Sequence, residues 1–375
     1  MHLLLVISSL GGGGAERVIV RLAEAWTAHG VHVTVATFAP SESDFYPLPP
    51  GVARRSMPDD ARGVRSLWPG PIARVRWLRT VMREVAPHAV ISFTDRTNVV
   101  ALLASRGWGL PVLVSERIDP EMYSPGRLWA VLRRMVYPLA TTIVVQTRKI
   151  QRWSERLFPR VRTRVIPNPA PVELPPFSGT TQPTILAVGR FGPQKGFDVL
   201  IDAFAQIAPR HPEWQLRILG DGELRPQLEQ QIERQCLAGR VELPGRCHNV
   251  LEQLAAAGLF VLSSRFEGFP NVLVEAMACG RAVVSTNCSS GPADLIEPGQ
   301  NGILVPVDDA AALAAAMEEL IDDPLLRAKL GHSAAEIRER LSMATILQMW
   351  NNALAESGCR LPESSESTSQ VSRAA

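Results

Sequence analysis

Residues 3–38, LLLVISSLGGGGAERVIVRLAEAWTAHGVHVTVATF, decide the fold. The apolar runs Leu3–Ser8 and Val31–Phe38 lack polar alternation, which is typical of strands buried on both faces. Between them, Ala15–His29 repeats its apolar residues at helical spacing. A strand, a helix and a second strand in this order predict a parallel pair with a crossover helix.

The same alternation continues along the chain, so the predicted fold class is α/β, with two Rossmann-like, doubly wound parallel-sheet domains facing each other across a cleft. The further strands are expected at Ala89–Phe93, Val112–Ser115, Ile143–Gln146, Thr184–Val188, Leu216–Leu219, Val241–Leu243, Leu259–Ser263, Ala282–Ser285 and Ile303–Val305.

The stretch Asn168–Gln182 is rich in Pro, Gly and Thr and has no periodicity, which predicts an interdomain linker. A chain of 375 residues also exceeds what one core usually supports. We therefore expect an N-terminal domain at 1–168, a linker at 169–182 and a C-terminal domain at 183–345. A helix at 346–358 is expected to pack back on the N-terminal domain, and the polar tail 359–375 is expected to be disordered.

Composition excludes several classes of protein. Five cysteines scattered over the C-terminal half argue against a disulfide framework or a zinc site and favour a cytoplasmic location. No apolar run approaches the roughly 20 residues that span a bilayer. The run Leu3–Ile7 lacks a basic leader, so a buried strand explains it better than a signal peptide.

Charge is divided unevenly between the halves. Residues 1–168 hold 23 Lys and Arg against 12 Asp and Glu, and the remainder holds 16 against 25. Basic segments with interleaved Trp predict peripheral binding to an anionic membrane, with a solvated arginine-rich face as the alternative. The cationic and Trp residues concerned are Arg54, Arg55, Arg62, Arg65, Trp68, Arg74, Arg76, Trp77, Arg79, Arg83, Arg127, Trp129, Arg133, Arg134, Arg148, Lys149, Arg152, Trp153 and Arg156.

Three segments carry residues suited to binding a phosphate or a sugar. In Ser8–Val18, four glycines run from a strand end into a helix start, where free backbone amides and the helix dipole favour an anion. In Val188–Phe204, Arg190 and Lys195 follow a strand and flank a Gly-Pro turn, an arrangement that suits a diphosphate. For each segment the alternative is structural, an ordinary turn or two solvated cations.

The third segment, Ser263–Thr286, is the strongest. A loop carries Glu267, and the helix expected from Asn271 to Cys279 carries Glu275 about one turn inside. The amides of Asn271 and Val272 should be unsatisfied first-turn donors. The loop therefore offers a carboxylate for sugar hydroxyls, amides for phosphate and a second carboxylate for a ribose diol. The alternative is a solvated acid and a helix-surface acid.

Together these segments resemble the retaining family 4 glycosyltransferases of the GT-B fold, over the chain to about residue 355. The resemblance rests on GGGAERV (12–18), GRFGPQKG (189–196) and EGFPNVLVEAMACG (267–280). VISFTDRTNVVALLAS (90–105) and VLVSERIDP (112–120) resemble the branch with the amylovoran galactosyltransferase and the N-acetylgalactosamine transferases of lipid-linked oligosaccharide assembly. This implies a UDP-sugar of galacto type and a polyprenyl-diphosphate-linked acceptor.

The resemblance also implies residue roles. Arg190 and Lys195 would clamp the donor diphosphate, Glu267 would hold the transferred sugar, and Glu275 would bind the ribose. The other donor-binding positions that it implies are Gly13, Gly14, Arg246, Gly268, Phe269, Asn271 and Val272.

One departure from the family concerns the catalytic region. Many relatives place a histidine at the end of the strand that matches Val112–Ser115, whereas this chain continues with Glu116 and Arg117. His88 precedes a different strand and is interpreted as structural. Asp95, Glu116, Arg117 and Asp119 are therefore the polar candidates for the catalytic region.

The expected chemistry is a retaining, front-face transfer in which the departing phosphate accepts the proton of the acceptor hydroxyl. Arg190, Lys195 and a helix N-terminus would stabilise the leaving diphosphate, so neither a metal nor a cofactor is expected, and no DxD sequence occurs near the site. Three alternatives remain: a nucleotide-sugar 2-epimerase, a transferase with a soluble acceptor, and a nucleic-acid-binding protein. The last leaves the glycine and Glu267 loops unexplained, so no nucleic-acid partner is expected.

Overall fold

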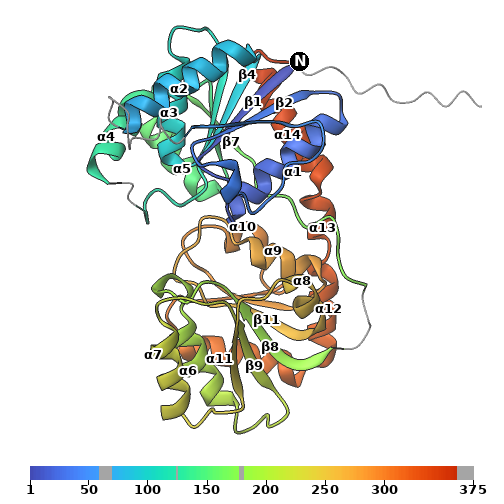
Figure 1. Cartoon of the computed structure of the whole chain (residues 1–375). Helices are drawn as coiled ribbons and strands as arrows, with labels where there is room; N and C mark the ends of the chain where they lie inside the picture. Colours follow the sequence, from blue (N-terminus) through green and yellow to red (C-terminus); the bar gives the residue numbers. More distant parts are fainter. Residues whose placement is uncertain (59–69, 124–125, 177–180, 361–375) are drawn as a thin grey trace, which may run out of the picture.

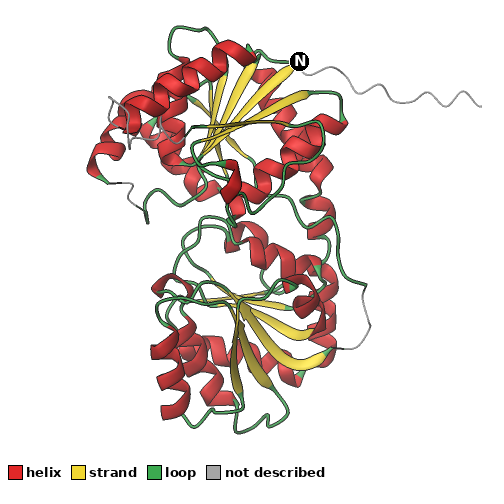
Figure 2. Ribbon diagram, in the orientation of Figure 1, coloured by secondary structure: helices red, strands yellow, loops and turns green. Residues whose placement is uncertain are grey.

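The computed structural model describes residues 1–58, 70–123, 126–176 and 181–360. They form two domains, one above the other in Figure 1, each with a central parallel sheet. Helices cover both faces of each sheet (Figure 2). The prediction of two doubly wound parallel-sheet domains is confirmed. The tail that was expected to be disordered lies outside the described residues from position 361 onward.

The N-terminal sheet has the strand order β3-β2-β1-β4-β5-β6-β7. Its strands are β1 (His2–Ile7), β2 (His32–Thr37), β3 (Ala53–Ser56), β4 (Ala89–Phe93), β5 (Val112–Ser115), β6 (Thr142–Val145) and β7 (Arg162–Val165). Its helices are α1 (Gly14–Ala28), α2 (Gly70–Val85), α3 (Asp95–Ser105), α4 (Arg127–Val136) and α5 (Arg148–Leu157), with short 3₁₀ turns at Ser41–Ser43 and Tyr137–Leu139.

The C-terminal sheet has the order β10-β9-β8-β11-β12-β13. Its strands are β8 (Gln182–Val188), β9 (Gln215–Leu219), β10 (Val241–Gly245), β11 (Ala257–Leu262), β12 (Val283–Thr286) and β13 (Ile303–Val305). Its helices are α6 (Phe197–Ile207), α7 (Arg225–Arg234), α8 (Val250–Ala256), α9 (Asn271–Ala278), α10 (Pro292–Leu295), α11 (Ala310–Asp322), α12 (Pro324–Ala334) and α13 (Ile337–Arg340), with a 3₁₀ turn at Pro193–Lys195. The last helix, α14 (Met343–Glu356), follows α13.

Strand β1 shows why an apolar run without alternation makes a central strand. Leu3, Leu5 and Ile7 face the core on the α1 side of the sheet, whereas Leu4 and Val6 face the core on the α2 side. All five side chains are fully buried, because successive residues of a strand point to opposite faces and both faces are covered.

Strands β3 and β7 were missed from the sequence. Both are edge strands of four residues that contain two arginines, and exposed positions alternate with half-buried or buried ones along each strand. An edge strand pairs on one side only and can present charged side chains to solvent. A search for continuous apolar runs therefore passes over it.

Helix α14 leaves the C-terminal domain and packs on the N-terminal one (Figure 1). Trp350 contacts the ring of Trp26 edge-on at 6.3 Å and stacks on Phe93 at 5.9 Å. The indole nitrogen of Trp26 donates a hydrogen bond of 2.9 Å to Asn351 Oδ1. The chain thus crosses between the domains twice, and α14 fixes part of their relative position.

The order of each sheet reverses next to its first strand, at the β1–β4 and β8–β11 neighbours. In doubly wound sheets, ligands bind beyond the carboxyl ends of the strands at such a point. The loops that follow these four strands are the glycine loop, the segment at Thr94–Asp95, the Lys195 loop and the Glu267 loop. The topology therefore gathers the predicted segments around one interdomain region.

Candidate active site

The centre of the candidate site is the pair Glu267 and Lys195, which come from loops after neighbouring strands. Lys195 Nζ lies 2.6 Å from Glu267 Oε1. The hydroxyl of Ser264 donates to the same oxygen at 2.6 Å, and Gln194 Nε2 lies 3.4 Å from the second oxygen. Glu267 is 5% exposed, so its carboxylate is held in one orientation by these donors.

Gly196 shows why the Lys195 loop needs a glycine. Its φ is +60°, and a Cβ there would lie 2.3 Å from the carbonyl oxygen of Ser263. Ser263 in turn donates from its hydroxyl to the Lys195 carbonyl at 2.8 Å. Only glycine combines this backbone conformation with so close an approach of the two loops.

Glu275 is buried in α9 and forms an ion pair with Arg17 of α1, in the other domain. Burial opposes the charged form of Arg17, but the neighbouring Glu275 carboxylate raises the pKa of Arg17 above its ordinary value. The ion pair joins the glycine-loop segment to the carboxylate predicted to bind ribose. Nothing in the spacing of either motif pointed to Arg17.

The start of α9 differs in one detail from the expected geometry. No side chain caps the helix, and no partner is recorded for the Val272 amide among the described residues. The Asn271 amide, which was predicted to be free, donates instead to the carbonyl of Phe269 at 3.0 Å. The turn at Pro270 folds the chain tightly enough to use this donor. Phe269 is buried.

Asn271 and Gly268 lie at close contacts between the two domains. A Cβ on Gly14 would lie 2.5 Å from Asn271 Nδ2, and one on Gly268 would lie 2.9 Å from the carbonyl oxygen of Arg117. Asn168 Nδ2 also donates to Asn271 Oδ1 at 2.7 Å. The glycines of both loops therefore permit close contact between the two domains.

The first turn of α1 is a second uncapped helix start. Gly13 occupies the N-cap position and provides no side-chain acceptor. A Cβ on Gly13 would meet the flexible carboxylate of Glu16 at 2.3 Å. The amides of this turn face the same region as the α9 N-terminus, because Gly14 adjoins Asn271.

Two predicted donor-binding residues do not join this group. Arg190 is exposed, and its recorded ion pair is with Glu223, at 3.9 Å. Arg246 follows β10 and is exposed as well. Both side chains are long and solvated, so their sequence positions beside strand ends do not fix where the guanidinium groups lie.

In the N-terminal domain, the structure brings Asp95, Glu116 and Arg117 to one small cavity of about 10 Å³. Thr94, which precedes α3, has a φ of +74°, a strained conformation for a non-glycine residue. The cavity has room for about one water molecule.

Glu116 is the most perturbed acid of this cavity. Burial raises its pKa to about 7, although Arg133 at 3.6 Å and a 2.5 Å hydrogen bond from the Tyr137 hydroxyl act in the opposite direction. Asp95 adds to the rise by repulsion. Glu116 can therefore hold or release a proton near neutral pH.

Arg117 is buried without a carboxylate partner among the described residues. Its Nη1 donates to Asn168 Oδ1 at 2.6 Å and its guanidinium stacks on Phe93 at 4.2 Å, but Nε and Nη2 have no partner. Burial lowers its pKa to about 9. Two unmet donors on a buried cation suit an anionic or hydroxyl-rich ligand. Asp119 instead pairs with Lys149 at 2.7 Å.

A cavity of about 200 Å³ lies at the domain junction beside Arg17 and Asn271. The linker segment Pro169–Glu173 forms one wall, and Leu251 of α8 and Arg21 of α1 line the others. This cavity adjoins the Arg17–Glu275 pair, so a group held by Glu275 could extend into it.

The basic segments differ in part from expectation. Trp153 is 5% exposed beneath Arg133, and Trp77 packs edge-on against Phe38, so neither is a surface anchor. Arg62, Arg65 and Trp68 lie outside the described residues. No helix in the described part of the chain is long and apolar enough to cross a membrane.

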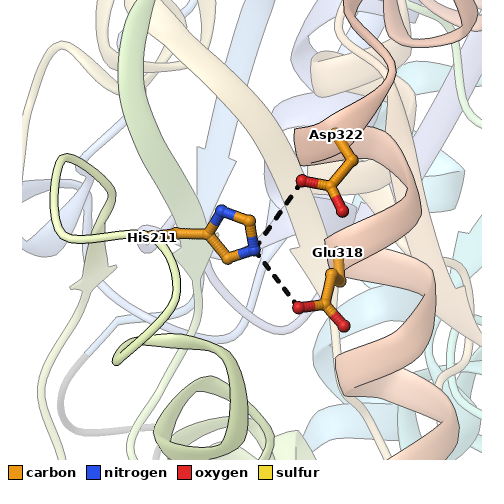
Figure 3. A group of neighbouring side chains, drawn as sticks. All are labelled: His211, Glu318 and Asp322. Carbon is orange, nitrogen blue, oxygen red and sulfur yellow. Dashed lines mark hydrogen bonds and ion pairs between the residues drawn. The ribbon is translucent and has the colours of Figure 1, made fainter.

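One group of possible metal ligands lies elsewhere, where His211 contacts Glu318 and Asp322 of α11 (Figure 3). His211 Nε2 lies 3.2 Å from Glu318 Oε1 and 3.8 Å from Asp322 Oδ1. Arg210 already binds the same Glu318 oxygen at 2.6 Å. The group is therefore explained as an ion network that ties the segment before β9 to α11.

The structure has two parallel-sheet domains that are joined by a linker and by the C-terminal helix α14, and paired carboxylates and cations lie between them. These features define a GT-B-type glycosyltransferase. Family models agree with this class: a "glycosyl transferase 4-like domain" matches residues 13–169 and "glycosyl transferases group 1" matches residues 175–337. The chain belongs to this family of glycosyltransferases.

Three curated relatives illustrate the match. An α-1,4-N-acetyl-D-galactosaminyltransferase of Campylobacter jejuni, named for an undecaprenol-diphosphate-linked saccharide, is 29% identical over 95% of this chain and 99% of its own. The amylovoran biosynthesis glycosyltransferase AmsD of Erwinia amylovora is 25% identical over 94% and 99%. An exopolysaccharide phosphotransferase of Streptomyces coelicolor is 34% identical over 75% of this chain, which spans only 29% of that protein.

Among solved structures, HepE of Anabaena in complex with UDP superimposes with a TM-score of 0.76 at 24% identity, covering 95% of this chain and all of that one. At this identity the likeness supports the fold alone.

Proposed function

We propose that the protein is a retaining glycosyltransferase that moves a hexose or N-acetylhexosamine from a UDP-sugar to a polyprenyl-diphosphate-linked saccharide in polysaccharide or glycan biosynthesis. The donor sugar would be Gal, GalNAc, Glc or GlcNAc. The observation that carries the proposal is the arrangement of Glu267 and Glu275, two buried carboxylates each paired with a cation, on either side of the uncapped α9 start.

The donor would bind along this arrangement. Glu267 would accept hydrogen bonds from the transferred sugar, the α9 N-terminus and Lys195 would face the diphosphate, and Glu275 would hold the ribose beside the 200 Å³ cavity. Lys195 and the helix dipole supply positive charge where the leaving diphosphate develops negative charge. We therefore propose transfer without a metal or a cofactor.

The acceptor would approach from the N-terminal domain, where Glu116 and Arg117 line the small cavity and the backbone of Arg117 packs against Gly268. Arg117 has two unmet donors for an acceptor oxygen. We propose a front-face transfer in which the departing phosphate takes the acceptor proton. NMR of the product tests retention: the anomeric configuration of the donor should persist.

The names of two relatives support a lipid-linked acceptor, and the surface of α4 supports an approach to a membrane. Leu128, Val131 and Met135 recur at i, i+3 and i+7 and are 63%, 57% and 69% exposed. Arg127 and Arg134 flank them and are exposed too. An amphipathic helix with this composition lies in the headgroup region of an anionic membrane. We propose peripheral attachment to the cytoplasmic face through α4.

The test is thermal stabilisation by a panel of UDP-, GDP-, ADP- and dTDP-sugars, repeated on Glu275→Ala. We expect a rise in Tm with UDP-sugars only, lost in Glu275→Ala. Glu24→Ala is the matched control, because Glu24 is a half-exposed helical glutamate paired with Arg21 on α1 and should leave the shift unchanged. Absence of a shift with every donor would remove the proposed donor site. Turnover of UDP-sugar without an acceptor would indicate an epimerase instead.

A further inference from the structure

The ion pair between Arg17 and Glu275 crosses the boundary between the two domains. Arg17 lies near the start of α1 and Glu275 lies within α9, and the two helices approach each other at the domain junction (Figure 1). The side chain of Glu275 is 9% exposed, whereas that of Arg17 is 45% exposed. Glu275 is therefore a buried carboxylate whose counter-charge comes from the other domain.

The second proposed donor carboxylate, Glu267, is held in a different way. Its partners Lys195, Ser264 and Gln194 all belong to the C-terminal domain, as Glu267 itself does. For the side chain of Glu275, Arg17 is the one recorded partner among the residues that the structure describes. The orientation and charge balance of Glu275 thus depend on the N-terminal domain, whereas those of Glu267 do not.

The ion pair leaves part of the Glu275 carboxylate available. A carboxylate can accept about four hydrogen bonds through its two oxygens. Arg17 contacts Oε1, and no partner is recorded for Oε2 within the described part of the chain. Hydroxyl groups can therefore bind Glu275 while Arg17 stays in place.

The position of Glu275 on α9 makes its charge important for a bound diphosphate. Glu275 lies four residues after Asn271, which is about 6 Å along the helix axis from the uncapped start of α9. An unpaired carboxylate at this distance repels a diphosphate and opposes the helix dipole. The pair with Arg17 is neutral, so the contact between the domains removes this repulsion.

We propose that Arg17 is a positioning residue for the donor, which orients and neutralises Glu275 across the domain boundary. The inference rests on the proposed function, in which Glu275 binds the ribose. It adds a regulatory property to that site, because recognition of the ribose then depends on the contact between α1 and α9. By linkage, a bound nucleotide strengthens this contact as much as the contact strengthens nucleotide binding.

The test compares the Kd values of UDP and 2′,3′-dideoxy-UDP, measured by isothermal titration calorimetry on the intact protein. The parent should bind UDP about tenfold more tightly or better, because the dideoxy compound lacks the hydrogen bonds to a charged group. Glu275→Ala should bind both nucleotides with similar, weaker affinity. Arg17→Met should lower the preference for UDP at least about fivefold, although Glu275 is still present. Arg17→Lys should retain part of the preference, because it keeps the charge but not the guanidinium fork.

Arg160→Met, which removes an exposed arginine elsewhere in the N-terminal domain, is the control and should keep the parent's preference. A purely structural ion pair would lower the Tm of Arg17→Met and leave its preference for UDP unchanged, which would overturn the assignment of Arg17. A stronger preference in Arg17→Met would overturn it too, because Arg17 would then compete with the ribose. A parent protein that binds neither nucleotide, or both equally, would contradict the proposed ribose site itself.

Discussion

At the scale of single residues, the site consists of charged groups whose surroundings hold them in place. Lys195 and Glu267 form an ion pair in which both side chains are largely buried, and two further donors fix the carboxylate. Glu116 is held between Tyr137 and Arg133 with a pKa near neutrality. Burial makes these interactions strong, and it also makes each partner costly to remove.

Lys195→Ala should lower kcat by about 10²–10³-fold, because the leaving diphosphate loses a preorganised cation. The measurement is steady-state transfer with a UDP-sugar and a lipid-linked acceptor. Lys329→Ala, which removes an exposed lysine of α12, is the control and should behave like the parent. Near-normal turnover in Lys195→Ala would contradict the proposed role.

Glu116→Gln should change how stability depends on pH. The folded-state pKa of about 7 lies above the ordinary 4.5, so the folded protein binds more protons between these values. Glu116 therefore lowers the free energy of unfolding as pH rises from about 4.5 to 7. Relative to the parent, the variant should gain stability from pH 5 to pH 8, measured by urea denaturation. An equal difference at both pH values would show that Glu116 does not titrate in this window.

At the scale of elements, two uncapped helix starts and one outward-facing helix carry the proposed function. Helices α1 and α9 begin without side-chain caps and meet at Gly14 and Asn271. Side-chain caps are also missing from α3, α4, α6, α7, α8, α10 and α13, whereas α5, α11, α12 and α14 each have one. Each of these caps satisfies one or two amides, whereas at α9 the Val272 amide has no recorded partner among the described residues.

Helix α4 has a surface that packing within the domain does not explain. Replacing Leu128, Val131 and Met135 together by Ser should reduce binding to vesicles that contain anionic lipid at least about tenfold, because three partly inserted apolar side chains are lost. Flotation with vesicles measures this. Leu325→Ser, at an 83% exposed leucine of α12, is the matched control. Unchanged flotation of the triple variant would exclude α4 as the contact.

At the scale of the whole molecule, the two domains touch through polar contacts and are bridged by α14. Thr147 bonds Ser290 at 2.8 Å, and the Arg148 amide donates to Asp294 at 3.1 Å. These contacts are few and separable, whereas the Trp350 contacts with Trp26 and Phe93 are apolar and buried. The contact of α14 with the N-terminal domain should therefore persist when the two domains close around a bound donor.

Trp350→Ala should cost about 3–5 kcal/mol of unfolding free energy, because the side chain is 1% exposed and leaves a cavity. Chemical denaturation followed by circular dichroism measures the loss. Gln348→Ala, on the exposed face of the same helix, should change stability by less than about 0.5 kcal/mol. A loss below about 1 kcal/mol for Trp350→Ala would show that α14 docking adds little.

The sequence by itself determined the two parallel-sheet domains and the loops that carry Lys195, Glu267 and Glu275. These follow from local signals: apolar runs, helical spacing and glycines at strand ends. Strands β3 and β7 were not predicted from the sequence, because the arginines of these edge strands interrupt the apolar runs.

Only the tertiary structure decided that Arg17 reaches Glu275, 258 residues away, that Arg190 faces solvent and that Glu116 is buried beside Tyr137. Ion pairing and desolvation depend on which surfaces meet, and no local spacing encodes that.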